Sequence, residues 1–223
     1  MTLQDKLDAF KADFRAGKAP YFAPPEVHAV MVKATNELIA SGLAERALKA
    51  GDVAPAFELE DGNGQMVSSS KLLKEGPLVV CFYRGVWCPC CNIELPALEE
   101  AFPSFKAEGA SLVAISPQTP ANSRKSARDW NISFPILSDA QGRIAAAFGV
   151  RHDLPSELIE LYSRLAINLP ALNNDSRWTL PMPARYVINR DGRILYSEIN
   201  PDYTVRPEPT DVLPVLRRSR ASP

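Results

Sequence analysis

One stretch of the chain decides how it folds: residues 78–91, Leu-Val-Val-Cys-Phe-Tyr-Arg-Gly-Val-Trp-Cys-Pro-Cys-Cys. It begins with an unbroken apolar run, which is typical of a central strand buried on both faces. Three of the four cysteines follow within four residues, at Cys88, Cys90 and Cys91. A helix is predicted soon afterwards, over 93–107. The sequence therefore places a cluster of thiols where a buried strand ends and a helix begins.

The composition is that of an ordinary globular protein. Of 223 residues, 46% are hydrophobic and 23% are charged, which excludes wholesale disorder. Subtracting 26 acidic from 25 basic residues leaves a net charge of −1, a poor match for nucleic acid or anionic lipid. No apolar run reaches the roughly 18 residues of a membrane helix, and the first residues resemble no secretory signal. We expect a cytoplasmic protein that binds neither nucleic acid nor membranes.

Strands alternate with helices along most of the chain, which predicts an α/β fold with a mixed or parallel sheet. The predicted helices cover 2–16, 26–49, 93–107, 120–130, 141–148, 156–165 and 211–218. The predicted strands cover 56–59, 78–83, 110–115, 134–137, 185–188 and 193–196.

The same pattern suggests how the chain is divided. Residues 1–50 are predicted to form an N-terminal helical arm, and residues 51–223 a single α/β domain. That domain begins with a β-hairpin, because Asp61-Gly62-Asn63-Gly64 is a strong turn signal before Met66. Residues 150–180 are rich in proline and irregular apart from one helix, so we interpret them as an insertion.

The position of the cysteine cluster favours redox chemistry. The unpaired N–H groups and positive dipole at a helix N-terminus stabilise a thiolate, which is the reactive form of cysteine. Cys88 is therefore the expected nucleophile, exposed at the turn. Cys91 lies three residues further on, so both side chains share one helical face and can form a Cys88–Cys91 disulfide. Cys90 is expected to point to the other side of the helix.

Structural and metal-binding interpretations compete with this one. A single Cys-x-x-Cys is half of a zinc site, but no second pair follows, and the two histidines, His28 and His152, lie far away in the sequence. We therefore expect no metal and no other cofactor. Cys81 lies inside the apolar strand and is expected to be an inert core residue. Leu180-Pro181-Met182-Pro183 runs into the strand over 185–188 and is a candidate for a cis peptide bond, with an ordinary trans proline at the strand start as the alternative.

Several motifs resemble those of a known family. Trp87-Cys88-Pro89-Cys90-Cys91 resembles the active site of the thioredoxin fold. Residues 183–194 resemble its cis-proline strand and following hairpin, and this resemblance implies a cis peptide bond before Pro183. The closer resemblance is to the peroxiredoxin-like branch of the alkyl hydroperoxide reductase/thiol-specific antioxidant family. It rests on four further stretches, at 51–57, 82–85, 114–119 and 134–139.

The resemblance implies a thioredoxin fold and a role for each site residue. Cys88 would be the cysteine that attacks a peroxide and Cys91 the cysteine that resolves the product as a disulfide, with Trp87 and Pro183 supporting the site. A thioredoxin-type reductant would then restore the thiols.

The sequence departs from the family pattern near the attacking cysteine. Gly85 stands where typical members carry a threonine or serine hydroxyl that binds the peroxide. Pro183 stands where they carry an arginine. Arg84 or Arg185 would have to replace that arginine.

These observations predict a peroxidase, namely a peroxiredoxin that reduces hydrogen peroxide or organic hydroperoxides. Two alternatives remain open: a thioredoxin-like protein thiol–disulfide oxidoreductase, and a redox-sensing binding module. The amphipathic arm suggests a homodimer. The sequence assigns no role to Cys90.

Overall fold

The computed structural model describes residues 1–221 and is built around one mixed seven-stranded sheet. The strand order is β2-β1-β5-β4-β3-β8-β9. The strands are β1 (Glu58–Asp61), β2 (Met66–Ser68), β3 (Leu78–Phe82), β4 (Ser111–Ser116), β5 (Ile136–Ser138), β8 (Ala184–Ile188) and β9 (Ile194–Ile199). At the centre, β3 pairs in parallel with β4 and antiparallel with β8. The predicted α/β fold is confirmed.

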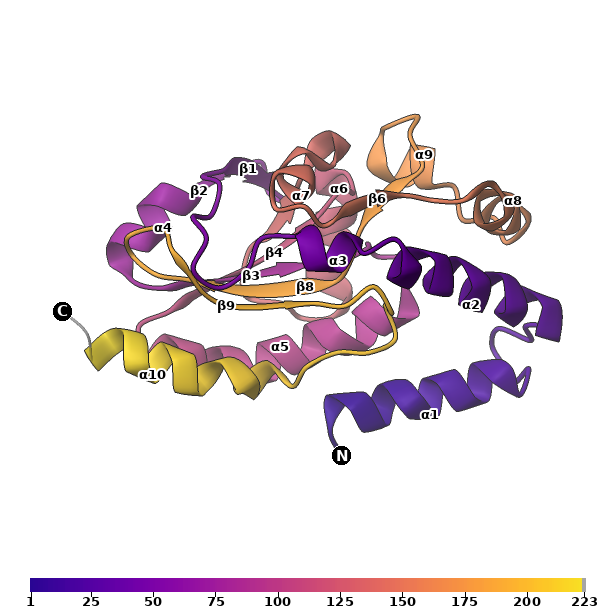
Figure 1. The fold of residues 1–223 in the computed structure, drawn as a ribbon, viewed down its shortest axis with the longest axis horizontal. Coiled ribbons are helices and arrows are strands. Elements are labelled where there is room, and N and C mark those ends of the chain that lie inside the picture. The colour runs from indigo at the N-terminus through magenta and orange to yellow at the C-terminus, as the bar shows by residue number, and fades with distance from the viewer. Residues whose placement is uncertain (222–223) are drawn as a thin grey trace.

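Helices cover both faces of this sheet (Figure 1). They are α1 (Leu3–Arg15), α2 (Pro25–Ala40), α3 (Leu43–Arg46), α4 (Ser69–Glu75), α5 (Pro89–Ala107), α6 (Pro120–Asp129), α7 (Arg143–Ala147), α8 (Ser156–Arg164), α9 (Leu169–Asn173) and α10 (Leu213–Ala221), with short 3₁₀ turns at Ala140–Gly142 and Pro209–Val212. Helices α1, α5 and α10 pack on one face, and α3 and α7 on the other.

The central strand supplies both cores because its side chains alternate between the two faces. Val79, Cys81 and Tyr83 pack against α5, whereas Val80 and Phe82 pack on the opposite side. All five residues of β3 are buried, as the unbroken apolar run predicts. The strand therefore fixes the starting point of α5 between two packed layers.

The segment over 150–180 is more regular than the sequence suggests. It contains β6 (Arg151–Asp153) and β7 (Thr179–Pro181), which pair antiparallel in a small second sheet, and it carries α8 and α9. A third apolar cluster joins this segment to the arm, because Val27 of α2 packs with Leu158 and Tyr162 of α8. The three-residue strands and five-residue α9 are too short to give a clear periodic signal.

The predicted helix over 26–49 is in fact two helices. Gly42 adopts a left-handed φ of 64°, which interrupts the helical backbone between the end of α2 at Ala40 and the start of α3 at Leu43. Helix α5 begins at Pro89, four residues before its predicted start, because proline suits the first helical position, where no N–H is required.

The expected cis peptide bond before Pro183 is wrong. Within residues 1–221, the cis bond that occurs joins Ala19 and Pro20. The chain instead runs on from β7 into β8, and its backbone stays paired on both sides of Pro183. Met182 N donates to Val150 O at 2.8 Å, and Asn200 N donates to Pro183 O at 3.1 Å. An extended chain with a trans peptide bond before Pro183 allows both of these backbone hydrogen bonds to form.

Within the described residues, no helix combines the length and the apolar character needed to cross a membrane.

The close approach of Gly76 and Gly109 generates a stability prediction. A Cβ at Gly76 would lie 1.9 Å from the Gly109 carbonyl oxygen, next to the start of β3. We expect Gly76→Ala to lower the free energy of unfolding by about 3 kcal/mol, because the two backbones must move apart. Denaturant unfolding measures this. Gly109→Ala is the control: its Cβ would meet open space, and its positive φ costs about 1 kcal/mol. Equal losses in the two variants would contradict the prediction.

Candidate active site

Cys88 occupies the N-cap of α5, at the end of the loop that leaves β3. Its φ and ψ of −91° and 113° are those of extended chain, and its carbonyl accepts the first helical hydrogen bond from Asn92 N at 3.0 Å. The loop itself is anchored, because Val86 N donates to the Gln118 side chain at 2.8 Å. Cys88 is thus held by backbone geometry at the positive end of the helix dipole.

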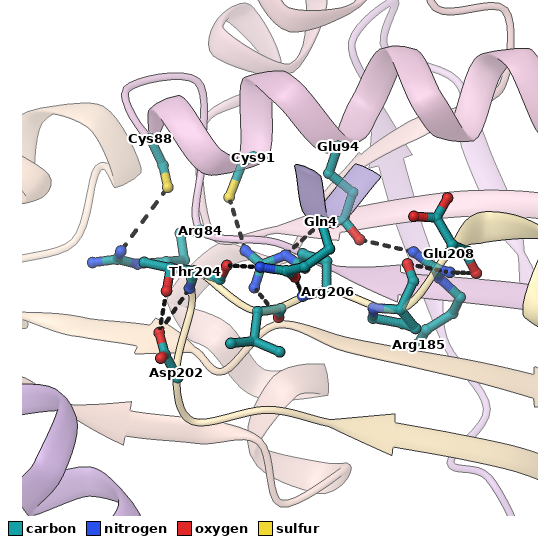
Figure 2. A network of polar contacts seen from close by, with 12 residues as sticks. Gln4, Arg84, Cys88, Cys91, Glu94, Arg185, Asp202, Thr204, Arg206 and Glu208 are labelled. Atoms are coloured by element: carbon teal, nitrogen blue, oxygen red, sulfur yellow. Dashed lines mark hydrogen bonds and ion pairs between the residues drawn. The ribbon is translucent and has the colours of Figure 1, made fainter. Parts of the chain in front are cut away.

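The thiol of Cys88 is buried and not exposed as expected, since only 1% of the residue is accessible. Arg84 lies directly against it, with Nη1 3.9 Å from Sγ (Figure 2). The rings of Trp87 and Tyr162 pack edge to face beside it, with centroids 5.4 Å apart. One of these rings, Tyr162, comes from the 150–180 segment. The sequence around Cys88 therefore does not indicate that the thiol is buried.

Arg84 is fixed by aromatic groups from three parts of the chain. Its guanidinium carbon lies 4.8 Å from the Trp87 ring and 4.0 Å from the Tyr203 ring. Its Nη2 donates a hydrogen bond to the Tyr162 hydroxyl. These contacts hold a positive charge beside Cys88, and no carboxylate within residues 1–221 forms an ion pair with it.

The environment of Cys88 stabilises its thiolate. Hydrogen bonds from the Cys90 and Cys91 thiols lower the pKa of Cys88 well below its ordinary value. Burial acts in the opposite direction, and the positive charge of Arg84 lowers the pKa further. The pKa values of Cys90 and Cys91 are raised, chiefly by the Cys88 thiolate and by burial. The negative charge therefore resides on Cys88.

Cys90 does not point away from Cys88 as expected. Regular helical spacing of the three cysteines would place Cys90 on the other side of the helix, but Cys88 is the N-cap residue and has non-helical dihedral angles. Cys88 can therefore accept hydrogen bonds from both following thiols.

Cys91 faces a second arginine. Its Sγ lies 3.8 Å from Nη2 of Arg206, and Nε of Arg206 donates to Glu94 at 2.8 Å (Figure 2). The other oxygen of Glu94 accepts from Arg185 Nη2 at 2.9 Å. All four side chains are buried, so one carboxylate holds two guanidinium groups behind Cys91.

The N-terminal arm ties down the segment that carries Arg206. Leu3 N donates to the Glu208 carboxylate at 2.6 Å, and the Gln4 side chain accepts from Arg206 N at 3.0 Å. The same side chain donates to Thr204 O at 3.3 Å (Figure 2). The arm therefore contributes to the geometry of the site although it is distant in sequence.

The remaining predicted residues lie further from Cys88. Arg185 pairs with Glu94 and donates to Glu208 O at 2.8 Å. Cys81 is buried in β3, and burial raises the pKa of its thiol to about 11, consistent with an inert core residue. Among residues 1–221, no group of three or more histidine, cysteine or acidic side chains has the geometry to hold a metal ion.

Four residues of the site were missed by the sequence argument: Glu94, Tyr162, Tyr203 and Arg206. Glu94 had a usable signal, because it stands three residues after Cys91 on the same helix. The other three are brought to the cysteines only by the tertiary fold.

A cavity of about 510 Å³ opens between α2, the β6–β7 sheet and α8. Arg84, Tyr162 and Tyr203 line it, so it reaches the groups that cover Cys88. Its apolar walls include Met31, Leu38, Leu154, Leu158 and Met182. Pro183 also borders this cavity.

Known proteins resemble this chain in sequence. The AhpC/TSA family model matches residues 50–197. A putative peroxiredoxin of Mycobacterium tuberculosis is 37% identical over 112 residues, which are 50% of this chain and 73% of that protein. A chloroplastic peroxiredoxin Q of Populus jackii is 35% identical over 104 residues, 47% of this chain and 48% of that one.

Solved structures agree with the sequence comparison. The crystal structure of peroxidoxin BcpB from Mycobacterium tuberculosis covers 79% of this chain and 99% of its own, with a TM-score of 0.61 and 27% identity. A peroxiredoxin-like protein from Aquifex aeolicus has the same fold, with a TM-score of 0.61, 19% identity and coverage of 78% and 88%.

The charge of Arg84 generates a prediction about the acidity of Cys88. We expect Arg84→Gln to raise the pKa of Cys88, because an opposite charge at this distance favours the thiolate. The pH dependence of iodoacetamide alkylation, read by mass spectrometry, gives the midpoint. Arg190→Gln is the control, since Arg190 donates to the carbonyl oxygen of Glu75 and not to a group of the cysteine site. An unchanged midpoint in Arg84→Gln would rule out this role of the charge.

The pairing of Glu94 generates a prediction about stability. Glu94→Ala leaves Arg185 and Arg206 buried without their carboxylate, and we expect a loss of about 3–5 kcal/mol in the free energy of unfolding. Denaturant unfolding measures the loss. In the control Glu157→Ala, an exposed pair with Lys33 is broken and little change is expected. A Glu94→Ala protein as stable as the wild type would show that the network carries little of the fold's stability.

Proposed function

The chain belongs to the AhpC/TSA family and is a thiol-dependent peroxidase, and we propose that Cys88 attacks the peroxide while Cys91 resolves the product. One observation carries the assignment of Cys88: it is the thiol whose pKa is lowered, at a helix N-terminus beside Arg84. Arg84, and not Arg185, stands close enough to act on a peroxide at Cys88.

The first step oxidises Cys88. Its thiolate attacks one oxygen of the peroxide, a sulfur–oxygen bond forms, and the oxygen–oxygen bond breaks. The sulfur loses two electrons and becomes a sulfenic acid, while the peroxide is reduced. The leaving oxygen takes a proton and departs as water or an alcohol. Arg84 stabilises the negative charge that develops on that oxygen.

The second step transfers reactivity to Cys91. The thiolate of Cys88 raises the pKa of Cys91 as long as Cys88 is reduced. Conversion of Cys88 into a neutral sulfenic acid removes that charge, whereas Arg206 stays 3.8 Å from Cys91. The pKa of Cys91 then falls, and its sulfur attacks Cys88 to form the Cys88–Cys91 disulfide with loss of water.

A thioredoxin-type protein is the proposed reductant, through thiol–disulfide exchange in a reducing cytoplasm. Because Cys88 and Cys91 are 1% and 0% exposed, the first turn of α5 must become accessible before such a donor can reach the disulfide.

The arm, residues 1–50, is proposed as a unit distinct from the domain over 51–223, and as the surface for a homodimer.

The cysteine roles generate a prediction about the oxidised product. One equivalent of hydrogen peroxide should remove two hydrogen atoms from the reduced wild type, add one oxygen atom to Cys91→Ser, and leave Cys88→Ser unchanged. Intact-mass spectrometry after rapid quenching distinguishes the three products. Cys81→Ala is the control and should behave as the wild type, since this buried thiol has its pKa raised.

Other results would reassign the roles. A disulfide that persists in Cys91→Ser but disappears in Cys90→Ser would make Cys90 the resolving residue. Slow oxidation by peroxide beside rapid reduction of an insulin disulfide would favour protein thiol–disulfide exchange instead.

A further inference from the structure

The loop that carries Cys88 has no free hydroxyl to offer a peroxide. Gly85 has no side chain, and a Cβ there would lie 2.9 Å from Trp87 Nε1 and 3.3 Å from the Gln118 side chain. Tyr83 does not fill this role, because its hydroxyl lies with Gln118, Ser116 and Ser126, and Tyr83 does not line the cavity that Arg84 borders. A hydroxyl donor at this site must therefore come from another part of the chain.

Tyr162 of α8 brings a hydroxyl to the site. It contacts Arg84 and packs against Trp87, and together with Arg84 it lines the cavity. Burial, together with the nearby Cys88 thiolate, raises the pKa of Tyr162, so the phenol stays protonated at neutral pH.

The hydrogen of that hydroxyl is free to bind a ligand. Arg84 has only donors, so the Tyr162 oxygen accepts in their shared hydrogen bond. The phenol hydrogen must point elsewhere, and no group within residues 1–221 accepts it. It is a buried, unused donor beside a cavity.

The geometry of attack decides which peroxide oxygen meets this donor. The attacked oxygen faces Cys88, so the leaving oxygen and its substituent lie away from the sulfur. Arg84 and Tyr162 both border the cavity of about 510 Å³, which has room for a substituent far larger than hydrogen. In a peroxide oriented this way, the leaving oxygen would lie on the side where Arg84 and Tyr162 border the cavity.

We propose that Tyr162 is a catalytic residue of this peroxidase, whose hydroxyl donates a hydrogen bond to the leaving oxygen of a peroxide bound at the inner end of the cavity. This inference rests on the proposed function of Cys88. Tyr162 stabilises the charge on the leaving oxygen as the oxygen–oxygen bond breaks, and solvent supplies the proton with which the alcohol or water departs. The phenol itself ends the step unchanged.

Tyr162→Phe tests the proposal, because it removes the hydroxyl and keeps the ring that packs against Trp87. The rate constant for oxidation of Cys88 should fall about 10- to 100-fold with both hydrogen peroxide and cumene hydroperoxide, as expected for one hydrogen bond to a developing charge. Alkylation of Cys88 by iodoacetamide needs no such donor, so its rate and its pH midpoint should not change.

Tyr186→Phe is the matched control and should retain the wild-type rate. Tyr186 also carries a buried hydroxyl, which has no hydrogen-bond partner within residues 1–221, but it packs on the opposite face of the sheet. Equal oxidation rates in wild type and Tyr162→Phe would overturn the inference. Parallel losses in oxidation and alkylation, with a raised midpoint, would also overturn it, because Tyr162 would then act only by positioning Arg84. A wild-type Cys88 that resisted peroxide would overturn the proposed function as well.

Discussion

The buried charges around the first turn of α5 balance best when Cys88 carries a negative charge. Arg84, Arg185 and Arg206 bring three guanidinium groups into the interior, and Glu94 is the carboxylate that pairs with two of them. Arg84 is left with aromatic rings, a tyrosine hydroxyl and a sulfur atom. An isolated buried cation is costly, so the fold gains from a thiolate at that position. Stability of the fold and reactivity of the sulfur thus depend on the same interaction, and oxidation of Cys88 to a neutral product removes it.

The parts of the molecule that follow from local rules could be predicted from the sequence. The apolar run over 78–83 indicates a central strand because strands buried on both faces need such a run, and β3 is that strand. The cysteine cluster after it indicates a thiolate at a helix N-terminus, and Cys88 is the N-cap of α5. The Asp61 turn and the hairpin it starts also follow from short-range preferences, and β1 pairs with β2 as expected.

What could not be predicted depends on contacts between distant segments. Burial of Cys88 requires Tyr162 and Tyr203, which lie 74 and 115 residues further along the chain. The position of Cys90 depends on the dihedral angles of one capping residue, which spacing arguments do not include. Arg206 and Gln4 lie outside the residues that match the family model, so neither a motif nor a family pattern indicates them.

The contacts of Leu3 and Gln4 with residues 204–208 determine the order in which parts of the site can form during synthesis. During synthesis the arm emerges before the sheet, whereas residues 204–208, which it contacts, are translated after every strand of the sheet, after helices α1 to α9 and after all four cysteines. Domains begin to fold while the chain grows, so the cysteines can enter a packed core before Arg206 is available to Cys91. In the growing chain the buried thiols would then lack the contact between Cys91 and Arg206. The full peroxidase site would be assembled only when the loop after β9 packs against α1.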